Sequence, residues 1–121
     1  MILDPHIKEL LLTAQSKALA TYSEYGLNVV PVSVLRMIDE DIILVNYFMD
    51  KTLKNIQENP TVALVCWTGT TGFQIRAHVD YQTSGEHYEL IKNWSRDQFP
   101  EREVKGILIL KPDGVFNISL A

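Results

Sequence analysis

Three consecutive residues, Asp50, Lys51 and Thr52, stand where an apolar strand pattern gives way to a short helix pattern. The first turn of a helix presents unpaired backbone N–H groups and the positive end of the helix dipole. An ammonium group at Lys51 and a hydroxyl group at Thr52 would therefore suit a phosphate group beside that turn. The residue types make this stretch a candidate anion site.

The same residues also have a simpler explanation. Asp50 is a suitable N-cap, and its carboxylate would satisfy the free amides and repel a phosphate. Lysine is common on helix surfaces. Judged on this stretch alone, an ordinary helix cap is the commoner arrangement. The choice between a cap and a phosphate site therefore depends on the rest of the sequence.

Length and charge narrow the function classes. The chain has 121 residues and a net charge of −4, which predicts one domain over residues 1–121 and gives no basic face for nucleic acid. No apolar stretch is long enough to span a membrane, and Asp4 precedes the first basic residue, unlike in a signal peptide. We therefore expect a cytoplasmic protein that binds neither nucleic acid nor membrane.

Cys66 lies in an apolar run and is expected to be a buried thiol.

The hydrophobic pattern predicts seven strands and three helices. Strands are expected at Ala18–Tyr22, Asn28–Met37, Ile42–Val45, Thr61–Thr68, Phe73–Thr83, Gly106–Leu110 and Val115–Leu120, with helices capped by Asp4, Asp50 and Ser84. Short turns make neighbouring strands antiparallel, and a small antiparallel sheet hides its edges best by closing. The expected fold is α+β and mainly β, an antiparallel barrel of about six to seven strands with peripheral helices.

Other polar stretches have plainer interpretations. Lys111–Gly114 contains a proline and an Asp-Gly pair, which predicts the tight turn of a closing hairpin. Arg96–Lys105 mixes acidic and basic residues and is expected to be a solvated loop. The three histidines lack metal-ligand spacing, so no metal site is expected; they are His6, His78 and His87.

Two short motifs and the order of the elements carry a family resemblance. Leu-Lys-Asn-Ile-x-x-Asn-Pro falls within Lys51–Pro60, Gly-Phe-Gln-Ile-Arg falls within Gly72–Val79, and Pro31 lies in the second strand. This order resembles the split-barrel flavin-binding family related to pyridoxamine 5′-phosphate oxidase. Within that family the chain is most similar to the small bacterial FMN-binding proteins, over nearly its whole length.

The resemblance implies that FMN binds in a groove at a homodimer interface, with residues of both chains at each site. The residues that would hold the phosphate are Lys51 and Thr52. The residues that would line the flavin from the second strand are Val30, Pro31, Val32 and Ser33. The residues that would follow the ring and the ribityl chain are Val45, Asn46, Tyr47 and Phe48. With the resemblance included, phosphate binding becomes the favoured role of Lys51.

The function implied is that of an FMN-binding flavoprotein, either an oxidoreductase or an electron-transfer protein. Its partner would be a small redox molecule or an electron-transfer protein, and no side chain is assigned to catalysis because the flavin carries the redox chemistry. The chain lacks the C-terminal extension of true pyridoxamine phosphate oxidases, so that reaction is not expected. The alternatives are a non-enzymatic module that binds a deazaflavin or haem, a flavin sensor, or an apo structural dimer.

Overall fold

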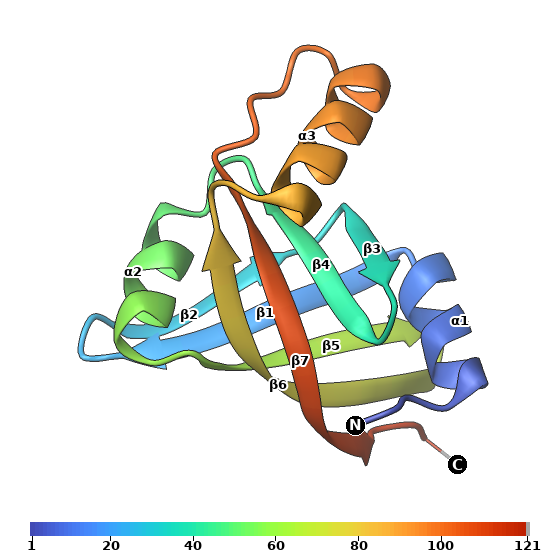
Figure 1. The fold of residues 1–121 in the computed structure, drawn as a ribbon. Helices are drawn as coiled ribbons and strands as arrows, with labels where there is room; N and C mark the ends of the chain where they lie inside the picture. Colours follow the sequence, from blue (N-terminus) through green and yellow to red (C-terminus); the bar gives the residue numbers. More distant parts are fainter. Residues whose placement is uncertain (121) are drawn as a thin grey trace.

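The computed structural model describes residues 1–120, and Ala121, the last residue of the expected domain, lies outside them. Three helices surround one strongly curved sheet of seven strands (Figure 1). The elements are α1 (Pro5–Thr13), β1 (Ser16–Ser23), β2 (Gly26–Pro31), β3 (Leu35–Ile38), β4 (Asp41–Asn46), α2 (Asp50–Glu58), β5 (Thr61–Thr68), β6 (Thr71–Gln82), α3 (Glu86–Gln98) and β7 (Gly106–Asn117). The expected mainly β, antiparallel split barrel is confirmed.

The strand order explains how the sheet closes. The order is β2-β1-β5-β6-β7-β4-β3, and every neighbouring pair is antiparallel. The two edge strands, β2 and β3, follow each other in sequence, joined by Val32–Val34. The N–H group of Val32 donates to the carbonyl of Lys17 at 3.0 Å, which extends the β1–β2 pairing past Pro31, and the short link keeps the β2 and β3 edges near each other. A groove can therefore form where the barrel is split.

The single strand expected over Asn28–Met37 is wrong, because the chain forms β2 and β3 with a break between them. β2 pairs with β1, whereas β3 pairs with β4 at the other edge of the sheet. One straight strand cannot reach both partners. Pro31, which has no N–H group to donate, ends β2 at the point where the chain changes partner.

The closing hairpin expected around Lys111–Gly114 is also wrong, since residues 106–117 form the single strand β7. β6 offers a partner along its whole length, and a register shift leaves Asp113 without an opposite residue, as in a bulge. Asp113 turns outward and accepts a hydrogen bond from Arg76 Nε at 2.7 Å. Pro112 is tolerated because β7 has only β6 as a neighbour beyond Leu110.

Two of the three expected helix caps are wrong, whereas Asp4 is confirmed as the N-cap of α1. Asp50 is the first residue of α2, and the N-cap is Met49. The N-cap of α3 is Gly85 with φ 103°, not Ser84, and Asp4 holds the N-cap position of α1 without a side-chain bond. The expected helix ends, by contrast, are confirmed at Asn59-Pro60 and Phe99-Pro100.

The core occupies both faces of the strands that position the groove. Ile42 and Leu44 of β4 point into the barrel, whereas Ile43 and Val45 face the cluster beneath α3. Cys66 is fully buried, as expected, and burial raises the pKa of its thiol. None of the helices in residues 1–120 has the length and apolar character needed to cross a membrane.

Candidate functional site

A groove of about 260 Å³ lies between the β2–β3 link and the residues that follow β4. Its walls are mostly apolar, and they consist of Val30, Pro31, Val32, Ser33, Val34, Val45, Tyr47, Phe48 and Met49. The structure thus brings together all the predicted site residues of the two strand segments except Asn46. The sequence interpretation did not include Val34 and Met49, although each directly adjoins a predicted residue.

The wall formed by Val32–Val34 offers backbone groups as well as apolar surface. Val32 and Val34 are buried and Ser33 is exposed. These residues lie between β2 and β3, and the N–H group of Val32 is their one contribution to the backbone hydrogen bonds found in residues 1–120. The N–H and C=O groups of Ser33 and Val34 are therefore available to a ligand.

Asn46 lies beneath the groove, where its side chain is 1% exposed. Its Nδ2 donates to the hydroxyl of Tyr81 at 2.9 Å, and its Oδ1 accepts from the N–H of Met49 at 2.7 Å. Gly106 faces Asn46 in β7, and a Cβ there would lie 2.2 Å from the Tyr81 hydroxyl. The amide of Asn46 is therefore used within the protein, where it fixes the chain that enters α2.

The predicted phosphate residues occupy the first turn of α2, next to the groove but not in its wall. Lys51 is exposed, and its Nζ donates to the carbonyl of Leu27 at 2.9 Å. Thr52 is 1% exposed, and its hydroxyl accepts from Asn28 Nδ2 at 2.8 Å. The N–H groups of residues 50–52 have no partner within the helix. An anion here would meet these amides and the remaining donors of Lys51.

The charge of Asp50 is partly offset by a cation from another part of the chain. Lys105 Nζ lies 3.9 Å from the Asp50 carboxylate and 5.5 Å from the centre of the Phe48 ring. The sequence interpretation placed Lys105 in a solvated loop, yet its N–H group donates to Asn46. Its position just before the strand that pairs with β4 is the signal that could have identified it.

Two arginines, Arg36 and Arg76, have partners elsewhere in the fold. Arg36 lies over the Trp94 ring at 4.5 Å, and Arg76 pairs with Asp113. Lys105 is therefore the second cation beside the first turn of α2.

A buried polar cluster fastens α2 to the β1–β2 hairpin. Asn55 is 0% exposed, and its Nδ2 donates to Thr21 Oγ1 at 3.0 Å and to the carbonyl of Gly26 at 3.1 Å. Its Oδ1 accepts from the Ser23 hydroxyl at 2.5 Å. Because this cluster satisfies every polar group of the Asn55 side chain, it sets where the first turn of α2 lies relative to the groove.

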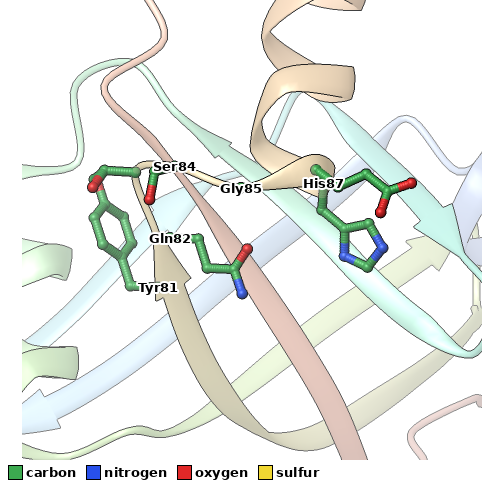
Figure 2. Close-up of a pocket in the computed structure, with 7 residues that line it drawn as sticks. Tyr81, Gln82, Ser84, Gly85 and His87 are labelled. Atoms are coloured by element: carbon green, nitrogen blue, oxygen red, sulfur yellow. The ribbon is translucent and has the colours of Figure 1, made fainter.

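A larger hollow of about 530 Å³ lies where β6 leads into α3, and Figure 2 shows the residues that line it, Tyr81–His87. In this view Tyr81 and His87 lie at opposite ends of the hollow, with Gln82 between them. Most of the link is exposed, and the Tyr81 hydroxyl already accepts from Asn46. The hollow contains none of the predicted site residues. Ligand sites are usually apolar with a few convergent polar groups, so the smaller groove is the better candidate.

The residues described here contain no group of three His, Cys, Asp or Glu side chains that could hold a metal ion.

Comparison with known proteins identifies the family. The model of the pyridoxamine 5′-phosphate oxidase family matches residues 3–119. The chain belongs to this family. An uncharacterised protein of Methanocaldococcus jannaschii is 29% identical to this chain over 106 residues, covering 84% of this chain and 71% of that protein.

Solved structures share the fold across nearly the whole chain. HupZ of Group A Streptococcus has a TM-score of 0.84 at 23% identity, covering 98% of this chain and 95% of HupZ. An FMN-binding protein of Syntrophomonas wolfei has a TM-score of 0.77 at 22% identity, covering 96% of this chain and 90% of that protein. At such identities the likeness establishes the fold alone.

Solved structures that share this fold include proteins named for different cofactors. HutZ, the haem storage protein of Vibrio cholerae, has a TM-score of 0.72 at 19% identity, covering 97% of this chain and 95% of HutZ. An F420 reductase has a TM-score of 0.70 at 16% identity, covering 94% of this chain and 98% of the reductase. The choice of cofactor therefore has to be argued from the groove.

Replacement of Asn55 by alanine should loosen α2. The Asn55→Ala change would leave Ser23, Thr21 and the Gly26 carbonyl without their buried partner, and we expect a loss of roughly 2–3 kcal/mol in the free energy of unfolding. Urea unfolding followed by circular dichroism measures this loss. Asn93→Ala, on the exposed face of α3, is the matched control and should change stability little. Equal stability of the two variants would contradict the role given to Asn55.

Proposed function

We propose that this protein is an FMN-binding flavoprotein that holds the flavin in the groove between the β2–β3 link and Tyr47–Met49. The observation that carries this proposal is an apolar groove that leads to the first turn of α2, where unpaired backbone amides and Lys51 could bind an anion. When bound, the flavin would supply hydride or electron transfer to a small redox molecule or an electron-transfer protein. The chain would bind and orient the flavin and keep water from its ring.

The groove suits a flat ring with one polar edge. Val30, Val32 and Val45 offer apolar contact, and the free backbone groups of Ser33 and Val34 offer donors and acceptors. These backbone groups require no charged side chain, so the ring would remain in an apolar setting. That combination of apolar walls with a few placed polar groups is typical of cofactor sites.

A phosphate group would lie at the opposite end, beside α2. The N–H groups of residues 50–52 and the ammonium group of Lys51 would contact it, and the ion pair of Lys105 with Asp50 reduces the repulsion from that carboxylate. This pair is exposed, so its contribution is small. Thr52 would contribute its backbone N–H, because its side chain is buried.

A second copy of the chain would complete each site. One chain provides about 260 Å³, whereas pockets for ligands of this kind usually exceed roughly 300 Å³. Large apolar side chains are exposed beside the groove, including Phe48 at 86% and Val29 at 68%. Exposed apolar surface next to a half-formed pocket supports a homodimer that covers both.

The groove also bears on the alternatives. Haem iron is commonly held by histidine or cysteine, and neither residue type lines the groove. A deazaflavin carries the same kind of flat ring and phosphate, so it is the second candidate, supported by the likeness to an F420 reductase. The groove favours flavin-type ligands over haem.

Reconstitution tests the choice of cofactor. The purified protein would be mixed with excess FMN, deazaflavin F420 or haemin, separated from unbound ligand, and measured by visible absorption. We expect flavin bands with about one FMN retained per chain. Retention of F420 but not FMN would move the assignment to a deazaflavin, and a Soret band without flavin retention would overturn it in favour of haem.

Lys51→Ala tests the phosphate end of the groove. Loss of a charge-assisted contact of about 1.5–3 kcal/mol should weaken FMN binding roughly ten- to a hundredfold, measured by quenching of flavin fluorescence. Lys54→Ala, an exposed lysine one turn further along α2, is the control and should bind nearly as the parent does. Unchanged affinity in Lys51→Ala would remove Lys51 from the site.

Val29→Glu tests the dimer. A carboxylate on this exposed part of β2 would be desolvated in the proposed interface, so sedimentation should show a monomer and FMN affinity should fall. Leu90→Glu places the same charge at another exposed apolar residue, on α3, and should remain dimeric. A dimer that survives Val29→Glu would place the interface elsewhere.

A further inference from the structure

A third space, about 320 Å³ in volume, lies between α3 and the link that leads from α3 into β7. Three of its lining residues are basic and one is acidic; the lining residues are Tyr88, Lys92, Arg96, Pro100, Arg102, Glu103 and Val104. The sequence interpretation treated residues 96–105 as a solvated loop, and that is wrong for residues 96–98, which belong to α3, and for Arg102, which is half-buried. The cavity shares no lining residue with the flavin groove.

The charge of this cavity contrasts with the rest of the chain. The protein has a net charge of −4, and four of its eleven lysines and arginines pair with carboxylates: Lys8, Arg76, Lys105 and Lys111. Lys92, Arg96 and Arg102 form no ion pair with any of the residues that the structure describes. Three like charges around one cavity repel one another, and Glu103 offsets only one of them.

Aromatic rings hold two of these cations in place. The guanidinium of Arg102 lies 4.2 Å from the centre of the Phe99 ring and 5.2 Å from that of Tyr47. The ammonium of Lys92 lies 5.7 Å from the centre of the Tyr88 ring. Contact with a ring face positions a cation without consuming its N–H donors. The donors of both residues therefore remain available to a ligand.

The third cation, Arg96, is placed beside Lys92 by the geometry of α3. Arg96 lies four residues after Lys92 on α3, so their side chains project from the same face. Arg102 approaches that face from the link beyond the end of α3. Two elements thus converge on the cavity with cations, and its volume falls within the range of small-molecule pockets.

We propose that this cavity binds a small molecule that carries phosphate groups, at a site separate from the flavin phosphate site on α2. Arginine presents a planar fork of donors that matches phosphate oxygens, and three cations suit an anion of more than one negative charge. The cavity shape selects a small molecule over a flat macromolecular surface. The proposal does not depend on FMN binding.

The test uses inorganic pyrophosphate as the probe, titrated into the cofactor-free full chain at low ionic strength and followed by calorimetry. Saturable binding of about one pyrophosphate per chain is expected. Arg96→Gln should weaken it at least about tenfold, because that exposed side chain makes no ring contact whose loss would disturb the fold. Arg102→Gln should weaken it similarly.

Two control variants localise the binding. Lys111→Gln removes the same charge from an exposed residue elsewhere and should bind pyrophosphate as the parent does, whereas Lys51→Ala removes the cation of α2 and should lose only the pyrophosphate that binds at that turn. Absence of binding to the parent protein, equal weakening in Lys111→Gln, or loss in Lys51→Ala alone would each overturn the proposal. Tighter binding of citrate than of pyrophosphate would contradict the phosphate assignment.

A parallel FMN titration of Arg96→Gln separates this proposal from the flavin function. The variant should retain FMN with the affinity of the parent, because Arg96 does not line the groove. Loss of pyrophosphate binding with FMN binding intact supports two sites. Equal loss of both ligands would show that the cavity and the groove are not independent.

Discussion

The buried amide of Asn46 is the interaction on which the geometry of the groove depends. It joins the end of β4 to Tyr81 of β6 and to the N–H group of Met49, at the start of α2. A buried amide left without partners is costly, so these three elements are held in one arrangement. The chain between Asn46 and Met49 forms one wall of the groove, and the position of that wall follows from this amide.

The candidate site combines an apolar groove with cations that lie outside it. Its walls are apolar and formed by strand ends, whereas the cations lie outside it, on the first turn of α2 and just before β7. The buried cluster around Asn55 fixes α2 against the β1–β2 hairpin, so that the free amides stay at one end of the groove. A ligand with a flat ring and a phosphate group would meet each surface where it is suited.

Local patterns in the sequence allowed the fold to be predicted, and the resemblance to the flavin-binding split-barrel family supplied most of the residues that line the groove. Alternation in β6 placed Ile75 and Ala77 inside, and the structure buries both completely. The divided strand after Pro31 and the continuous β7 were missed, because they depend on which strand each segment meets across the sheet. No local pattern encodes that choice of partner.

The same limit applies to the charged residues. Lys105 reaches Asp50, and Arg102 lies over Tyr47, from a segment distant in sequence. A segment of mixed charge is typical of a solvated loop, so the contacts of Lys105 and Arg102 could be identified only from the three-dimensional structure. The side chain of Thr52 was assigned to a ligand from its helix position, but its burial against Asn28 follows from the packing of α2.

The most direct test of the account is a ¹⁵N–¹H correlation spectrum of the protein titrated with FMN. We predict that the largest amide shifts fall on Val32–Val34, Tyr47–Met49 and residues 50–52, because the ring would lie against the first two segments and the phosphate against the third. Amides of the Tyr81–His87 hollow and of the Lys92–Val104 cavity should change little. Large shifts confined to either of those places, with the groove amides unchanged, would contradict the account.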